Sequence, residues 1–331
     1  MSITAVSNIR RTTEVTQLDG VASAVGGQQI RIPLNKQSLV EEHIVRIQAS
    51  QAYTGVPTSA DVRRFIATLS VESSDGRRKF MTGYEAYDLA RWTMNGDNPV
   101  TVLAATSTAD FQFNLHHANN GTLFDMMSAI DAAKLNTFDL VIQFAPDTAN
   151  GFIGGTTPLV TNYTVTVRNN NFPGMLINPA TGQLSTYVDA LRHINETQTV
   201  QGASGGGTTA PLLRLTAGNK TRFIMIHAFN TTSGVAVPSD AIVSNLRLTI
   251  NGQERKITDY ITTQKLGMAN RQFFVPGTQI PGLAVIDFGD DEAGWLDLRG
   301  VAEPYLSWDI AVGAPASWSV TFAQDYNIVM K

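Results

Sequence analysis

The chain contains one strand–turn–strand pattern twice, and this repeat constrains its fold more than any other feature. The first copy spans 65–90 (FIATLSVESSDGRRKFMTGYEAYDLA) and the second spans 243–267 (VSNLRLTINGQERKITDYITTQKLG). Apolar and polar residues alternate in each, which is typical of a half-buried strand. Asp75-Gly76 and Asn251-Gly252 then favour a two-residue turn of type I′, because that turn needs positive φ at both central positions. Each copy therefore predicts a β-hairpin.

The segments that flank the two hairpins also correspond. Three further pairs recur in the same order: 28–49 with 211–229, 110–146 with 283–315, and 163–167 with 318–322. The offset between partners drifts along the chain, as loops of different length would produce. Because the blocks keep their order, the sequence predicts a duplicated domain.

Length and composition fit two packed domains. The 331 residues suffice for two cores of ordinary size, and a hydrophobic content of 43% with 16% charged residues describes a folded chain. The absence of cysteine excludes disulfides and thiolate metal sites, and it fits folding in a reducing cytoplasm. A net charge of −4 provides no basic field for nucleic acid. The sequence shows no apolar run of bilayer length and no signal sequence at its start.

Turn-rich and aperiodic stretches set the expected boundaries. We predict an N-terminal arm over 1–27, a first domain over 28–168, an interdomain linker with a short helix over 169–210, and a second domain over 211–331. The arm lacks periodicity and ends in Gly26-Gly27. The linker has no counterpart at the end of the chain, and its stretch QGASGGGTTA (201–210) is typical of a flexible connection.

Only three segments have helical features, so the predicted fold class is all-β with a few short helices. The segment 84–99 predicts a short helix that is stopped by Asn95-Gly96 and Pro99. The segment 122–135 gives the clearest helical pattern, with an apolar stripe at spacings of three. In 184–194 the apolar residues would share one helical face.

Catalytic motifs receive little support. Residues 202–206 match the G-x-S-x-G pattern of hydrolases, but that motif needs a strand before the serine, and this one lies in the predicted linker. His116 and His117 are adjacent, so on a strand they face opposite sides and are poorly placed to bind one metal. They are interpreted as loop-end histidines. The sequence therefore predicts no catalytic or cofactor-binding residues and no enzyme activity.

An acidic cluster in the second domain is the one candidate metal site. Asp290, Asp291 and Glu292 lie between Asp287 and Asp297, and their oxygens could bind a structural Ca²⁺ or Mg²⁺. The cluster lacks the glycine and glutamate spacing of an EF-hand. A solvated acidic loop is therefore the preferred interpretation, with an ion site as the alternative.

Two tandem β-domains, each with about eight strands and a helix before its penultimate strands, predict two jelly rolls. The order of the blocks RIPLNKQSLVEEHIVRI (31–47), the first hairpin, FDLVIQF (138–144) and SWDIAV (307–312) resembles the double jelly-roll major capsid proteins. These proteins form the shells of tailless, membrane-containing icosahedral viruses of bacteria and archaea. The resemblance covers nearly the whole chain, and a bacteriophage is the expected source.

The resemblance implies a structural function. Three chains would form a homotrimer of pseudo-hexagonal outline, and neighbouring trimers would tile an icosahedral shell over an internal lipid membrane. Minor capsid and vertex proteins would be further partners, and the arm over 1–27 would reach neighbouring chains or the membrane. The protein would be made in the host cytoplasm, reside in the virion, and have no specific nucleic-acid binding.

Two other classes fit a duplicated β-protein. A carbohydrate-binding β-sandwich, such as a phage spike or lectin, would present exposed aromatic residues in a groove. A bicupin-like enzyme would carry metal ligands in each half. The sequence supplies neither pattern, and oligomeric mass would separate the three classes.

Overall fold

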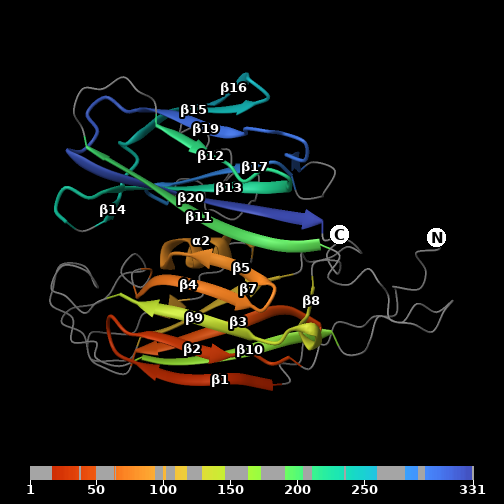
Figure 1. Cartoon of the computed structure of the whole chain (residues 1–331). Coiled ribbons are helices and arrows are strands. Elements are labelled where there is room, and N and C mark those ends of the chain that lie inside the picture. Colours follow the sequence, from red (N-terminus) through yellow and green to blue (C-terminus); the bar gives the residue numbers. More distant parts are fainter. Residues whose placement is uncertain are drawn as a thin grey trace. The chain divides into compact units, whose positions relative to one another are not determined.

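The structure of the protein is a computed structural model. It describes residues 17–36, 39–49, 63, 65–93, 100–101, 109–117, 129–145, 163–172, 191–203, 211–234, 236–258, 280–289 and 295–329. The chain divides into two compact units: residues 1–90, 98–194 and 329–331 form the first, and residues 91–97 and 195–328 form the second. Strands make up most of the described chain (Figure 1), which confirms the all-β class. Among the described residues, no helix has the length and apolarity to cross a bilayer.

The first unit contains two antiparallel sheets. One has the order β1 (Gln17–Ala24), β10 (Tyr163–Phe172), β3 (Leu39–Ala49), β7 (Ala109–His116) and the short β6 (Val100–Thr101), and β8 (Ile130–Asp131) pairs with the start of β3. The other has the order β2 (Gln29–Pro33), β9 (Phe138–Phe144), β4 (Ile66–Ser73) and β5 (Gly76–Met81).

Alternating side chains of these strands form the core of the first unit. Val45 and Ile47 on β3 and Leu140 and Ile142 on β9 are fully buried. Tyr163 on β10 stacks on Phe144 of β9 with ring centroids 4.4 Å apart. Since these two strands belong to different sheets, the contact shows that the sheets pack face to face.

The second unit repeats this topology. Its first sheet contains β11 (Leu191–Ala203, in this unit from residue 195), β20 (Ser317–Val329), β13 (Lys220–Asn230) and β17 (Leu283–Asp287), with β18 (Leu296–Asp297) and β14 (Val237–Pro238) also paired to β13. Its other sheet has the order β12 (Leu212–Arg214), β19 (Tyr305–Ile310), β15 (Val243–Ile250) and β16 (Gln253–Thr258). Strand for strand, the two sheets follow the order of the first unit, and the duplication is confirmed.

The two repeated hairpins turn differently. Asn251 and Gly252 have φ values of 52° and 75°, which confirms the type I′ turn between β15 and β16. In the first hairpin the expected turn is wrong, because the turn consists of Ser74 and Asp75 and only Gly76, with φ 124°, is positive. A bulge also shifts the register between β4 and β5, because Glu72 pairs with Arg77 and Val71 with Lys79, which leaves Arg78 as the extra residue.

One predicted helix is confirmed. α2 (Gly83–Thr93) begins at a capping box in which Thr82 Oγ1 accepts from Glu85 N–H (3.4 Å) and Glu85 Oε2 accepts from Thr82 N–H (2.9 Å). The T-x-x-E pattern that encodes this cap is visible in the sequence.

The other two predicted helices are wrong where the structure describes them. Within 122–135, residues 130–131 form β8 and Ala132–Lys134 form a short 3₁₀ helix, because β8 pairs with β3. Within 184–194, residues 191–194 belong to β11. In both segments strand pairing with distant residues overrides the local helical spacing. Residues 122–128 and 184–190 lie outside the described part of the chain.

The first strand of each unit lies where the sequence predicts none. β1 falls in the predicted arm and pairs with β10 from Gln17 to Ala24, and β11 falls in the predicted linker. Residues 17–24 are therefore a sheet strand and not an arm, and 201–203, the first residues of the predicted flexible stretch, form the end of β11. Residues 1–16 and 204–210 lie outside the described residues.

Candidate functional site

The interior of the first unit holds a cluster of titratable side chains. Five of them expose 5% or less of their surface: His43 on β3, Arg78 and Lys79 on β5, His117 after β7, and His193 on β11. We call these five residues the basic cluster. Buried ionisable groups in a β-sandwich core cost free energy unless they are paired or neutral, so the geometry of each pair matters.

Two of the histidines form a buried pair. His43 Nδ1 lies 2.8 Å from His117 Nε2, and the rings meet edge to face with centroids 5.0 Å apart. Phe138 of β9 packs against the ring of His43 at 5.4 Å. At this distance one ring nitrogen donates its proton and the other accepts it, so the accepting ring must be neutral at that nitrogen.

The surroundings keep both rings neutral. Burial lowers the pKa of His43 to about 3. Burial also lowers the pKa of His117 well below its usual value, and the charges of its neighbours in the basic cluster lower it further. Both effects disfavour the charged imidazolium. At neutral pH the pair is therefore uncharged.

A second pair fixes the start of β11. Lys79 Nζ lies 3.2 Å from His193 Nδ1, and because an ammonium can only donate, His193 accepts at that nitrogen. The neighbouring residue Arg192 donates to the backbone oxygen of Asp75 (2.8 Å) and forms an ion pair of 2.5 Å with its carboxylate. Both contacts attach the segment 191–194 to the first hairpin.

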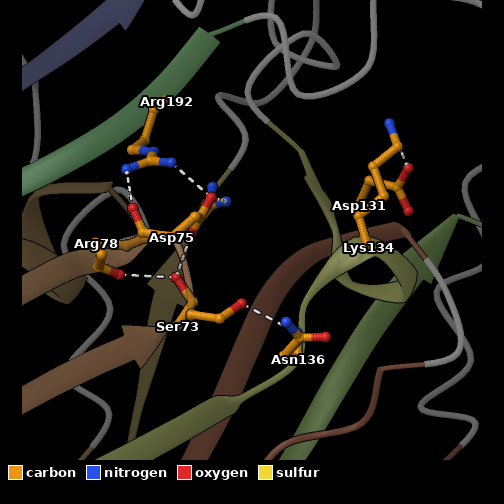
Figure 2. A network of polar contacts seen from close by, with 9 residues as sticks. Ser73, Asp75, Arg78, Asp131, Lys134, Asn136 and Arg192 are labelled. Atoms are coloured by element: carbon orange, nitrogen blue, oxygen red, sulfur yellow. Dashed lines mark hydrogen bonds and ion pairs between the residues drawn. The ribbon is translucent and has the colours of Figure 1, made fainter.

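Asp75 is the centre of the polar network in Figure 2. Arg78 and Arg192 both reach its carboxylate, Arg78 at 2.8 Å, and Ser73 also contacts it. Burial by itself raises the pKa of Asp75, but the hydrogen bond from Ser73 and the two arginine charges outweigh it and lower the pKa. The carboxylate is therefore ionised at neutral pH.

The same turn is held on its other side by the segment before β9. Asn136 N–H donates to Ser74 Oγ (3.0 Å), and Ser74 N–H donates to Thr137 O (3.0 Å). Nearby, Lys134 and Asp131 form an ion pair at 2.8 Å (Figure 2). The first hairpin turn is thus fastened to two segments that are distant in sequence.

The second unit has an apolar side chain at the position that corresponds to His43. His43 pairs with Asn169 on β10, and the equivalent register places Ile224 opposite Gln324 on β20. Ile224 belongs to an apolar core that also contains Trp308 and Trp318. In the described part of the second unit, this position therefore offers no imidazole for such a pair.

The predicted acidic site cannot be placed. Asp290, Asp291 and Glu292 lie outside the described residues. Of its flanking acids, Asp287 accepts from Gly289 N–H (3.0 Å), and Asp297 pairs with Arg299, whose hydrogen bonds lower the pKa of Asp297 to about 2. In the part of the chain that the structure describes, no three His, Asp or Glu side chains group together as metal ligands.

The histidine and serine motifs have structural positions. His116 faces Glu42 (Nδ1 to Oε2, 3.1 Å) while His117 meets His43, so the two adjacent histidines point to different partners as expected. Both lie at the end of β7, as interpreted from the sequence, but His117 is 1% exposed and so belongs to the core. Gly202 of the G-x-S-x-G match lies in β11, where it passes close to the ring of Trp318.

Sequence reasoning missed the basic cluster. Its members come from four segments that are far apart in the chain, and no spacing relates them. The nearest signal is the run EEHIVRI (41–47), in which a histidine takes the place of an apolar residue on the inward face of a strand. A polar residue in that register indicates a buried polar partner, but it does not say which one.

Comparison with known proteins rests on structure alone. No protein-family model matches the chain, and no curated protein matches its sequence. The major capsid protein of Sulfolobus turreted icosahedral virus matches with a TM-score of 0.68 and 13% identity, over 95% of this chain and 96% of that chain.

Two further capsid structures match at full length. The major capsid protein P2 of bacteriophage PM2 has a TM-score of 0.59 and 13% identity, over 96% of both chains. The PBCV-1 virus capsid structure has a TM-score of 0.54 and 12% identity, over 96% of this chain and 94% of that one. The chain has the double jelly-roll fold. Its two units, each with two sheets of four main strands, are the two jelly rolls, as the resemblance in sequence order implied.

Proposed function

We propose that the protein is a major capsid protein that self-assembles into an icosahedral virion shell. The observation that carries the proposal is the match of both jelly rolls, over 95% of the chain, to a viral major capsid protein of nearly equal length. Matches to the PM2 and PBCV-1 capsid structures, which also extend over both jelly rolls, support it. The role is structural and not enzymatic.

The duplicated architecture supports a particular assembly. Each chain contributes two jelly rolls of the same strand order, so a homotrimer would present six similar domains and a pseudo-hexagonal outline. Neighbouring trimers would tile the shell, with minor capsid and vertex proteins as further partners. A net charge of −4 suits a shell over an internal lipid membrane at least as well as direct contact with a genome.

The proposal places the protein in the virion of a tailless bacteriophage after synthesis in the host cytoplasm. It includes no specific binding of nucleic acid. An arm formed by residues before β1 would reach neighbouring chains or the membrane, as the resemblance to double jelly-roll capsid proteins implies.

The mass of the purified protein in solution tests the proposal. We expect light scattering to give a trimer near three times 35.8 kDa. A stable monomer that binds sugars would contradict the capsid role and favour the carbohydrate-binding alternative.

The same measurement with a chelator tests the acidic cluster. A solvated loop at Asp290, Asp291 and Glu292 leaves the trimer unchanged, which is the result we expect. Dissociation on chelation, reversed by Ca²⁺ or Mg²⁺, would instead assign an ion to the cluster.

A further inference from the structure

Two hydrogen-bonded pairs within the basic cluster join four segments of the first jelly roll. His43 joins β3 to the residue after β7 through His117, and Lys79 joins β5 to the start of β11 through His193. All four side chains are at least 95% buried. Each pair depends on an imidazole nitrogen that accepts a hydrogen bond, and a protonated imidazole has no such nitrogen.

We propose that these two pairs form an acid-operated latch, which holds residues 191–194 and the end of β7 in the first jelly roll and releases them when the histidines gain protons. A proton on His193 places two cations 3.2 Å apart. A proton on the accepting ring of the His43–His117 pair turns two ring N–H groups toward each other. Both changes occur inside a core where charge is poorly solvated.

The charged groups around the latch are mixed. β3 contributes Glu41 and Glu42, which are both 4% exposed. Glu42 accepts from Asn114 (3.3 Å) and faces His116 on β7. Protonation of His116 would therefore place a cation next to Glu42.

The side of the latch that faces β5 and β11 is basic. There the charged groups are Arg78, Lys79 and Arg192, with Asp75 between the two arginines. Added protons on the histidines therefore increase an existing positive charge. Figure 2 shows the ion pairs of Arg78 and Arg192 with Asp75, which acid leaves intact until the carboxylate is protonated.

The direction of the pH effect follows from where the protons bind. An unfolded histidine titrates near about 6.5, and burial lowers the pKa of His43 and His117, so their pair is fully formed above that pH. Below it, each such histidine shifts the opening equilibrium by about tenfold per pH unit. At about pH 5 one histidine increases opening by about 30-fold.

Hydrogen exchange on the full chain, followed by mass spectrometry and corrected for the intrinsic effect of pH, tests the latch. Between about pH 7.5 and about pH 5 we expect peptides that contain 191–194 and 109–117 to lose about 30-fold or more of their protection. Peptides of β15 and β19, in the second jelly roll, should keep their protection over the same pH range. Equal loss in both jelly rolls, or no loss in the first one, would overturn the proposal without any variant being needed.

The variant His193→Gln makes the test specific. Glutamine keeps an acceptor for Lys79 but cannot be protonated, so we expect its peptides over 191–194 to lose markedly less protection on acidification. The matched control is His227→Gln, which changes a histidine that is 2% exposed in the second jelly roll. His227→Gln should leave the acid-induced loss of protection in the first jelly roll unchanged. A His193→Gln profile identical to that of the wild type would refute the role of this pair.

Discussion

Gly202 lies so close to the ring of Trp318 that adding a side chain to it should destabilise the second jelly roll. A Cβ atom added to Gly202 would lie 2.3, 2.7 and 2.8 Å from ring atoms Cζ2, Cε2 and Cη2 of Trp318. Carbon atoms pack at about 3.5 Å or more, so the indole would have to move by about 1.2 Å. Trp318 is 4% exposed in the core of the second jelly roll, and its neighbours limit that movement.

We therefore expect Gly202→Ala to lower the free energy of unfolding of the second jelly roll by about 1–3 kcal/mol, the usual cost of overpacking. Denaturant unfolding followed by circular dichroism measures the change. The adjacent Ala203→Ser, at an exposed position of the same strand, should stay within about 0.5 kcal/mol and serves as the control.

A double-mutant cycle isolates the contact. Trp318→Leu removes the ring atoms, so Gly202→Ala should cost at least about 1 kcal/mol less in that background than in the wild type. Two results would refute the reasoning: a Gly202→Ala protein as stable as the wild type, or costs that simply add in the double variant.

Three further predictions concern single contacts. Asp88 and Arg63 form a buried ion pair at 3.1 Å, with side chains 0% and 8% exposed. Asp88→Asn leaves the arginine charge without this partner, so denaturant unfolding should show that the free energy of unfolding falls by about 3–5 kcal/mol. A fall below about 1 kcal/mol would contradict the pairing. Gly252→Ala should destabilise the protein by about 1 kcal/mol and Gly252→Asn by less, because φ is 75° there; equal costs would argue against the type I′ turn. Asp75→Asn should make the protein less stable than the wild type at neutral pH. Because the pKa of Asp75 is lowered in the folded protein, this difference in stability should shrink as pH falls below about 4. A difference that does not depend on pH would exclude the charged contact of Asp75 with its arginines.

The missed first strands show what a sequence pattern can and cannot predict. QLDGVASA and LRHINETQTVQGA contain few regularly alternating apolar residues, so neither suggests a strand. Each becomes one because a long partner strand, β10 or β20, offers it backbone hydrogen bonds. β-strand formation depends on such pairing more than on local preference, which also explains why residues 130–134 and 191–194 are not helical.

The candidate site was still less accessible to prediction. The acidic cluster at 290–292 is visible in the sequence because its residues are contiguous. The basic cluster is not, because His43, Lys79, His117 and His193 come from segments far apart in the chain. A buried histidine and a solvated one look the same in a sequence. Their pKa values differ only because of what folds around them.

The sequence by itself determined the duplication, the hairpins and the turn at Asn251-Gly252, because each depends on residues that are neighbours in the chain. Alternation sets which side chains face inward, and an Asn-Gly pair sets φ without help from elsewhere. The tertiary structure alone decided which strands complete each sheet, how the first hairpin turns, and which buried groups meet. Those outcomes depend on contacts between residues far apart in the sequence, where packing and desolvation outweigh local preference.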